Sequence, residues 1–243
     1  MGIALSAWLT LSFWTTPARA LIYPWVLLEP EHDSRDPDMI DSDRAHSQNL
    51  VAIVGASEKI FDHHLVWCEI PIRKLLSISA PFCELHFDAI HQLTLTAEEK
   101  QVLKEYIKRG GFLLCFIDAY PYSEDQYWPV KQWNFIDFLT HELPASDPGF
   151  TVGRATDAFP IFSFYYKTRT ADAIRHEFAG NPNTPNRTLL FYRGRLCVFV
   201  MGDYGYFDGA QWVPLDRPFP RSFSTDPKSY ELMVNIYAYS IAH

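Results

Sequence analysis

One stretch decides the fold of this chain: Leu93-Thr-Leu-Thr-Ala-Glu-Glu-Lys-Gln-Val-Leu-Lys-Glu-Tyr-Ile-Lys-Arg-Gly-Gly-Phe-Leu-Leu-Cys-Phe-Ile-Asp118. Thr96 and Glu99 stand at the spacing of a capping box, in which each side chain bonds the backbone N–H group of the other residue. Apolar residues then recur on one helical face, and two basic residues precede Gly110, a residue type that commonly ends helices. The pattern predicts a helix over residues 97–109.

A buried strand is expected directly after this helix. Every residue from Phe112 to Ile117 is apolar, as in a parallel strand that is covered on both faces. The strand ends at Asp118, so the stretch is half of a βαβ unit with a carboxylate at the edge where α/β sheets bind ligands. Similar patterns predict strands at 21–28, 64–72 and 81–87, a strand pair or hairpin within 189–201, and helices at 129–143 and 227–242. Residues 44–54 end at Gly55; the run 49–54 fits a strand by composition, whereas the glycine that follows suits a helix, and both stay open.

These elements indicate one α/β domain over residues 21–243, with a largely parallel, doubly wound sheet. Residues 144–186 differ from the rest, because they are rich in Pro, Gly, Asp and Asn and show weak periodicity. They also contain the aromatic run from Phe159 to Tyr166. We therefore expect an aromatic-rich insertion that is packed by its own rings.

Residues 1–20 have the features of a secretory signal peptide. An apolar stretch of suitable length ends at Ala18-Arg19-Ala20, an A-x-A cleavage site, although no Lys or Arg precedes it. The alternatives are an upstream start codon or a short membrane-associated segment. The stretch is shorter than the roughly 20 apolar residues of a spanning helix. We expect an exported protein, periplasmic or extracellular, with no transmembrane span in the mature chain.

Charge and cysteine usage restrict the partners and the chemistry. The net charge of −8 becomes about −9 without residues 1–20, and an acidic chain lacking a Lys/Arg cluster does not suit nucleic acid or anionic lipid. Export would permit disulfides. However, each cysteine lies in a separate apolar run, which favours buried free thiols at Cys68, Cys83, Cys115 and Cys197.

Three predicted strands end in carboxylates, and these form the first candidate site. Asp88, Asp118 and Asp203 would lie along one edge of a parallel sheet. Two or three of them could hold Mg²⁺ or Ca²⁺, with Asp118 and Asp203 the metal candidates. They could instead form an acid/base pair, or simply cap the loops that follow the strands. Neighbouring residues extend the set of ligand-binding candidates to Asp118, Tyr120, Asp203, Tyr204, Asp208, Trp212 and His86.

Two further segments have less specific signals. Residues 202–212 combine glycines, rings and acids, which suits a loop that binds a sugar or polar ring and equally suits a tight aromatic turn. The acid-rich residues 29–43 lack the spacing of a calcium-binding EF-hand loop, so we expect a solvated loop there. His63-His64 is expected at the surface, at the start of a strand.

Several signatures of enzymes are missing from the sequence. It contains no G-x-S-x-G elbow, no Walker A loop, no G-x-G-x-x-G and no H-E-x-x-H. Cys115 lies within its predicted strand rather than on a strained turn after it, so a nucleophilic role is not expected. No cofactor is evident, and a divalent cation is the one that remains possible.

An ordered set of motifs carries a resemblance to a known family. The first group is Leu95-Thr96, Glu99, Tyr106, Gly110-Gly111-Phe112-Leu113 and Asp118, and the second is Leu143-Pro144, Phe159-Pro160-Ile161-Phe162, Gly194-Arg195-Leu196, Phe207-Asp208-Gly209 and Met233-Val234-Asn235. Over residues 80–243 this order resembles the bacterial family called domain of unknown function 4159. The family often has paired aspartates at Ile117-Asp118 and a His at Phe159, so a metal site built on those residues is weakened here.

The resemblance implies a flavodoxin-like sheet, related to class I glutamine amidotransferases but without their catalytic Cys and His. Many members are parts of larger membrane proteins, which implies that this chain is a free-standing, exported version with an envelope or membrane protein as partner. The first functional hypothesis is a non-catalytic binding or interaction module of the cell envelope. The alternative is a hydrolase-like enzyme that uses Asp118 with Asp203 or Asp208, with or without a divalent cation.

Overall fold

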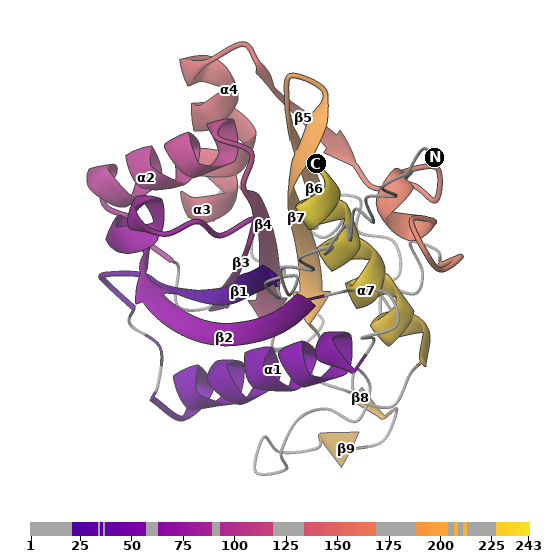
Figure 1. The fold of residues 1–243 in the computed structure, drawn as a ribbon. Coiled ribbons are helices and arrows are strands. Elements are labelled where there is room, and N and C mark those ends of the chain that lie inside the picture. The colour runs from indigo at the N-terminus through magenta and orange to yellow at the C-terminus, as the bar shows by residue number, and fades with distance from the viewer. Residues whose placement is uncertain are drawn as a thin grey trace, which may run out of the picture.

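The computed structural model is a three-layer α/β/α structure built on one seven-stranded sheet (Figure 1). It describes residues 21–33, 35, 37–56, 63–88, 93–118, 134–168, 188–203, 207–208, 211–212 and 227–243. Residues 1–20, the expected signal peptide, lie outside the described residues. No helix within the described parts has both the length and the hydropathy needed to cross a bilayer.

The sheet has the strand order β2-β1-β3-β4-β7-β6-β5. Its strands are β1 (Leu21–Glu29), β2 (His63–Pro71), β3 (Phe82–Asp88), β4 (Phe112–Asp118), β5 (Phe150–Arg154), β6 (Thr188–Tyr192) and β7 (Arg195–Asp203). The first five strands in this order pair in parallel, and β6 and β5 add an antiparallel edge. The parallel part has the 2-1-3-4-5 order of flavodoxin-like proteins, so the expected doubly wound α/β fold is confirmed. A separate pair is formed by β8 (Phe207–Asp208) and β9 (Gln211–Trp212).

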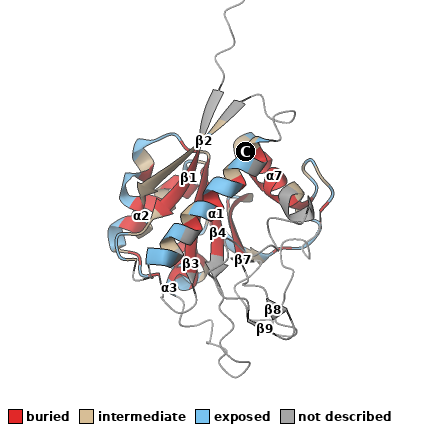
Figure 2. Ribbon diagram, turned by 90° about the horizontal axis from the view of Figure 1, so that it is seen from below, coloured by how far each residue is buried: buried red, intermediate tan, exposed pale blue. Residues whose placement is uncertain are grey.

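Helices cover both faces of the sheet (Figure 2). One face carries α1 (Pro37–Gly55) and α7 (Pro227–Ala242), together with the short 3-10 helix η4 (Pro160–Phe162). The other carries the 3-10 helix η1 (Ile72–Ser77), α2 (Ala97–Lys108) and a continuous helical run of α3 (Asn134–Asp137), η3 (Phe138–Glu142) and α4 (Leu143–Ser146). Each face has its own apolar core, because successive side chains of a strand point to opposite sides.

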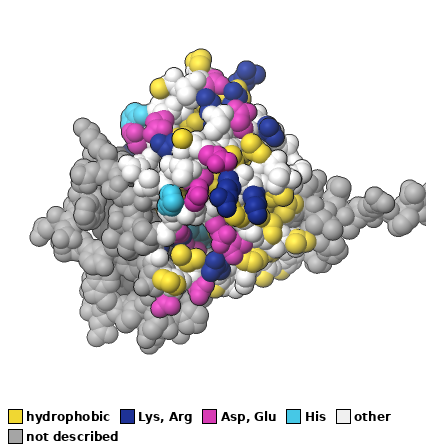
Figure 3. All heavy atoms as spheres, turned by 90° about the vertical axis from the view of Figure 1, so that its left-hand side faces the viewer, with side chains coloured by type: hydrophobic (Ala, Val, Ile, Leu, Met, Phe, Trp, Pro, Cys, Tyr) yellow, Lys and Arg dark blue, Asp and Glu magenta, His cyan; other side chains and the backbone are white. Residues whose placement is uncertain are grey.

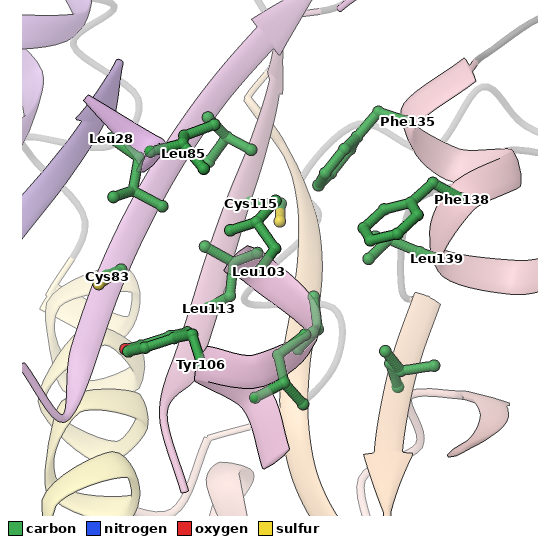
Figure 4. Packing of buried hydrophobic residues seen from close by; sticks show 14 of the residues in the cluster. Leu28, Cys83, Leu85, Leu103, Tyr106, Leu113, Cys115, Phe135, Phe138 and Leu139 are labelled. Carbon is green, nitrogen blue, oxygen red and sulfur yellow. The ribbon is translucent and has the colours of Figure 1, made fainter. Parts of the chain in front are cut away.

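The core on the α2 face shows how the two layers meet (Figure 4). Leu113 and Cys115 project from β4 toward Leu103 of α2, while Phe135 and Phe138 approach from the α3–η3 run. All five side chains are buried. Burial on this face therefore orients α2 and the α3–α4 run against the sheet.

The expected helix and hairpin are confirmed at residue level. Helix α2 begins with a complete capping box between Thr96 and Glu99, and Gly110 follows it with φ of 106°. The turn between β6 and β7 is Arg193-Gly194, both with positive φ, as a two-residue hairpin requires. The helix expected at 129–143 is described from Asn134 and continues to Ser146. Pro144 does not end it, because this residue lies in the first turn of α4, where proline is tolerated.

Two expectations along the chain are changed by the structure. The open choice at 44–54 resolves as helix α1, which begins at Pro37, so the predicted solvated loop at 29–43 was wrong in its second half. Phe150–Arg154 lies inside the range expected to be an insertion, yet it forms the edge strand β5. Edge pairing with β6 satisfies its backbone groups, which a packed excursion would have had to satisfy otherwise.

Candidate functional site

The described residues contain a pocket of about 310 Å³ at the carboxyl ends of β1, β2 and β3. Strand β1 is the topological switch point of the sheet, because α1 leads from it to β2 on one side while β3 pairs with it on the other. In flavodoxin-like sheets, ligands bind where the strand order reverses in this way. We call this cavity the switch-point pocket. The titratable side chains that line it are Glu29, Glu31, Asp33, Arg35, Asp43, Arg44, Glu69, Arg73, His86 and Glu99.

A buried carboxylate, Glu84 of β3, organises the side chains below the pocket. Its Oε2 accepts hydrogen bonds from Nε1 of Trp25 at 2.6 Å and from Oγ of Ser47 at 2.7 Å. The hydroxyl of Ser47 in turn accepts one from Nε1 of Trp67 at 3.0 Å. The other carboxylate oxygen of Glu84, Oε1, lies 2.5 Å from Nε2 of His86. Glu84 is fully buried, so these contacts replace the water that a charged carboxylate would otherwise need.

His86 lies between two carboxylates and connects Glu84 to the pocket. Its Nε2 faces Glu84, and its Nδ1 lies 3.2 Å from Oδ1 of Asp43 on α1. Burial alone would lower the pKa of His86, but Asp43 and Glu84 raise it well above its usual range. Burial would likewise raise the pKa of Glu84, and the nearby His86 and His46 bring it below its ordinary value. The imidazole of His86 is therefore held between two carboxylates, which favour its protonated form.

Asp43 extends the chain of charges to a guanidinium at the pocket. Its Oδ2 accepts from Nη1 of Arg35 at 2.5 Å, while Nη2 of Arg35 reaches Asp33 at 2.7 Å. The side chains of Arg35 and Asp43 are each 7% exposed. Burial would raise the pKa of Asp43, but His86 and Arg35 hold it below its ordinary value. The expected solvated loop is thus corrected here, because Asp33 and Asp43 are fixed in buried or half-buried ion pairs.

Other charged side chains fix the rim of the pocket. Arg44 contacts Glu29, Asp41 and Glu69, the last at 2.7 Å. The capping residue Glu99 also accepts from the backbone N–H of Glu31 at 2.7 Å, which ties the loop after β1 to the start of α2. Acidic and basic side chains alternate on the face shown in Figure 3, without a large area of one sign. The rim of the pocket therefore carries charged side chains of both signs, and several of them are held in place by ion pairs.

Of the predicted site residues, His86 is the one whose side chain the structure describes at this pocket. The backbone register aligns Asp88 with Asp118 and Asp118 with Asp203 on three adjacent strands. Neighbouring strands lie about 4.8 Å apart, so the three positions are side by side at one edge. Their side chains lie outside the described residues, and a site built on them stays a prediction. Tyr120 and Tyr204 also lie outside, as do the side chains of Asp208 and Trp212 in the β8–β9 pair.

Most of the residues that meet at His86 were not among the site residues predicted from the sequence. Glu84 and His86 are alternate residues in an otherwise apolar strand, which places both on one face. On α1, the residues Asp43, His46 and Ser47 have the spacing of a single helix face. Their burial on one side of the helix can be inferred only when residues 37–55 are known to be helical.

The strand order and the switch-point pocket define a flavodoxin-like α/β protein. No protein-family model matches the chain, and no curated protein matches it in sequence. Among solved structures, a protein described as ThuA-like from Bacteroides uniformis ATCC 8492 is similar at 11% identity, with a TM-score of 0.45. The match covers 92% of this chain and 93% of that protein.

Proposed function

We propose that this protein is a non-catalytic binding module of the bacterial cell envelope, which takes a small polar ligand in the switch-point pocket. The observation that carries the proposal is the position of this pocket at the reversal of strand order, where sheets of this type bind ligands. Export rests on the signal-like residues 1–20. Membership in the domain of unknown function 4159 family, and the envelope setting that it implies, rest on the ordered motifs.

The charges of the lining favour a neutral or cationic ligand over an anion. Six carboxylates line the pocket against three guanidinium groups. Two of those guanidinium groups, Arg35 and Arg44, are already paired with several carboxylates each. An anion would have to displace these pairs, whereas hydroxyl or amine groups can bond the remaining carboxylate oxygens.

The chemistry of the lining also favours binding over nucleophilic catalysis. Among the described residues that line the pocket there is no Ser, Thr, Cys or Lys. The imidazole of His86 is engaged on both sides by carboxylates, so it is not placed to activate a hydroxyl or thiol. The lining can therefore orient a ligand through hydrogen bonds without a covalent step.

Thermal melting of the full chain tests this proposal against three sets of small molecules: neutral sugars and polyols, amines, and organic phosphates. A ligand that binds only the folded state raises the melting temperature. We expect a rise with a member of the first or second set. The ligand-induced rise in melting temperature should differ from that of the wild type in Arg73→Ala, whose side chain is half-exposed at the rim of the pocket. In the control Arg109→Ala it should equal that of the wild type. A rise with phosphates alone, or turnover of a glycan or ester, would contradict the proposal.

The second candidate function is a hydrolase-like enzyme with a divalent cation on the strand-end carboxylates. The register that aligns Asp88, Asp118 and Asp203 on adjacent strands favours it. It predicts that Mg²⁺ or Ca²⁺ raises the melting temperature of the wild type and not of Asp118→Asn. If neither ion has an effect, the carboxylates act as loop caps and this candidate is dropped.

A further inference from the structure

Two imidazoles and one carboxylate converge in the buried region beneath the switch-point pocket. His46 comes from α1, and Glu84 and His86 come from β3. One ligand atom from each of the three residues lies within 4.8 Å of the others. All three are buried, with exposures of 4%, 0% and 2%. Side chains from two elements distant in sequence thus present three potential metal ligands to one point.

The donor set selects a class of metal ion. Two imidazole nitrogens and one carboxylate oxygen suit first-row transition ions such as Zn²⁺, whereas Mg²⁺ and Ca²⁺ prefer oxygen ligands alone. Bonds of 2.0–2.2 Å at tetrahedral angles place ligand atoms roughly 3.4 Å apart. Small side-chain rotations would bring the three atoms from within 4.8 Å to that spacing, with the short contact between Glu84 and His86 opening slightly.

The second layer of contacts around these residues is of the kind that supports metal ligands. Metal-binding histidines usually place their other ring nitrogen against a carboxylate, and Nδ1 of His86 faces Asp43 at 3.2 Å. Asp43 is itself held by Arg35. On the carboxylate ligand, Trp25 and Ser47 bond Oε2 of Glu84, while Oε1 faces the imidazole of His86. Both candidate ligands on β3, Glu84 and His86, are therefore held in orientation by neighbouring side chains.

The surroundings supply a dry floor and a route of entry. The ring of Phe116 lies 4.9 Å from that of His86 and 5.0 Å from that of His46, between ring centroids. An apolar layer of this kind limits water at a metal site. On the other side, His86 lines the switch-point pocket, through which an ion can reach the cluster.

We propose that His46, Glu84 and His86 bind a divalent transition-metal ion, with zinc as the probe, and that Asp43 positions His86 for it. The ion lies between the two imidazoles and the carboxylate, and three protein ligands leave a fourth position for water or a ligand. This site is separate from the strand-end aspartates. It does not depend on the small-ligand proposal, because metal binding is measured with no other ligand present.

The first experiment measures the metal bound by the full chain after loading with Zn²⁺ and gel filtration. We expect about one zinc ion per chain for the wild type, as for a three-ligand site. His46→Gln and His86→Gln should lose this ion, while Asp43→Asn should weaken zinc binding about 10- to 100-fold, as second-layer changes do. The control His141→Gln, an exposed histidine on η3, should bind zinc like the wild type.

A second measurement needs no variant and so does not depend on how the variants fold. Anomalous diffraction at the zinc edge from crystals of the loaded wild type should place the ion about 2.0–2.1 Å from a ring nitrogen of His46 and of His86. Cobalt in place of zinc should give the visible absorption of a site with nitrogen and oxygen ligands. An ion located elsewhere, or zinc binding that survives in both histidine variants, would overturn the proposal.

Discussion

Nε1 of Trp25 donates a hydrogen bond to Oε2 of Glu84, 59 residues further along the chain, at 2.6 Å, and both side chains are fully buried. The bond joins neighbouring strands at the switch point of the sheet. The indole also stacks on Tyr237 of α7, with ring centroids 5.5 Å apart. Glu84 is thus held by a core residue on one oxygen and by the site residue His86 on the other, which couples the stability of the sheet to the geometry of the site.

The substitution Glu84→Gln should destabilise the fold by about 3 kcal/mol, because it removes one of the two carboxylates that compensate the buried charge on His86 and leaves only Asp43. Chemical unfolding in the presence of EDTA measures this for the metal-free protein. The matched control is Glu142→Gln, whose ion pair with Lys100 is at the surface and should matter by about 1 kcal/mol or less. Equal effects of the two substitutions would show that His86 is not charged in the folded state.

The substitution Thr96→Ala should cost about 1 kcal/mol, the usual loss when a helix cap is removed. Glu99→Ala should cost more, because Glu99 is buried and accepts from the backbone of Thr96 and of Glu31. Urea unfolding of both variants checks the order. If the Thr96 variant were the less stable one, the link between α2 and the loop after β1 would contribute nothing.

The substitution Gly111→Ala should destabilise the protein by about 2 kcal/mol through overpacking. An added Cβ would lie 2.2 Å from Cζ of Tyr106, whose buried hydroxyl donates to the carbonyl of Phe112. Gly55→Ala is the control, since its nearest neighbour would be 4.0 Å away, at Leu65. That change, at the end of α1, should be neutral or stabilising by up to about 1 kcal/mol. An unfolding midpoint below that of the wild type for Gly111→Ala, together with one equal to or above it for Gly55→Ala, would confirm the prediction.

The cysteines should differ in their reactivity with thiol reagents. Burial raises the pKa of all four thiols above the ordinary value, that of Cys197 to about 12, and therefore depletes the reactive thiolate near neutral pH. Cys68 is half-buried, whereas Cys83 and Cys115 lie among hydrocarbon side chains (Figure 4). We expect Cys68 alone to react in the folded protein, faster as the pH rises toward its pKa. In denaturant without reductant all four should react, and fewer would reveal a disulfide.

The substitution Asn235→Ala should cost about 2–4 kcal/mol and loosen the segment after η4. Oδ1 of Asn235 accepts from the backbone of Tyr165 and of Tyr166 at 2.8 Å, and Nδ2 donates to the carbonyl of Tyr166 at 2.8 Å. Without the amide these backbone groups lose their partner. Gln101→Ala, an exposed change on α2, is the control and should stay within about 0.5 kcal/mol of the wild type. Hydrogen exchange at the Tyr165 and Tyr166 amides should rise in the first variant only.

Local signals in the sequence were sufficient to predict an element wherever residues within a few positions of one another determine its start or its turn. Thr96 and Glu99 predict the start of α2, and Arg193-Gly194 predicts a turn between two apolar runs. Helix α1 was harder to predict, because its first turns contain acids and most of its apolar residues lie together at 50–54 rather than at helical spacing. Its buried face includes Asp43, His46 and Ser47, polar residues that a hydrophobic pattern cannot count.

By itself, the sequence determined the α/β class, the parallel strands and the edge at which their carboxyl ends meet, because capping, periodicity and apolar runs act over a few residues. Only the tertiary structure decided that Glu84 and His86 meet Asp43 and His46, and that Arg35 in turn pairs with Asp43. Those contacts join β3 to α1 and to the loop before it across about 40 residues of sequence. Their partners are chosen by how the helix packs on the sheet. A polar residue in an apolar strand signals that it needs a partner, and only the packed fold supplies one.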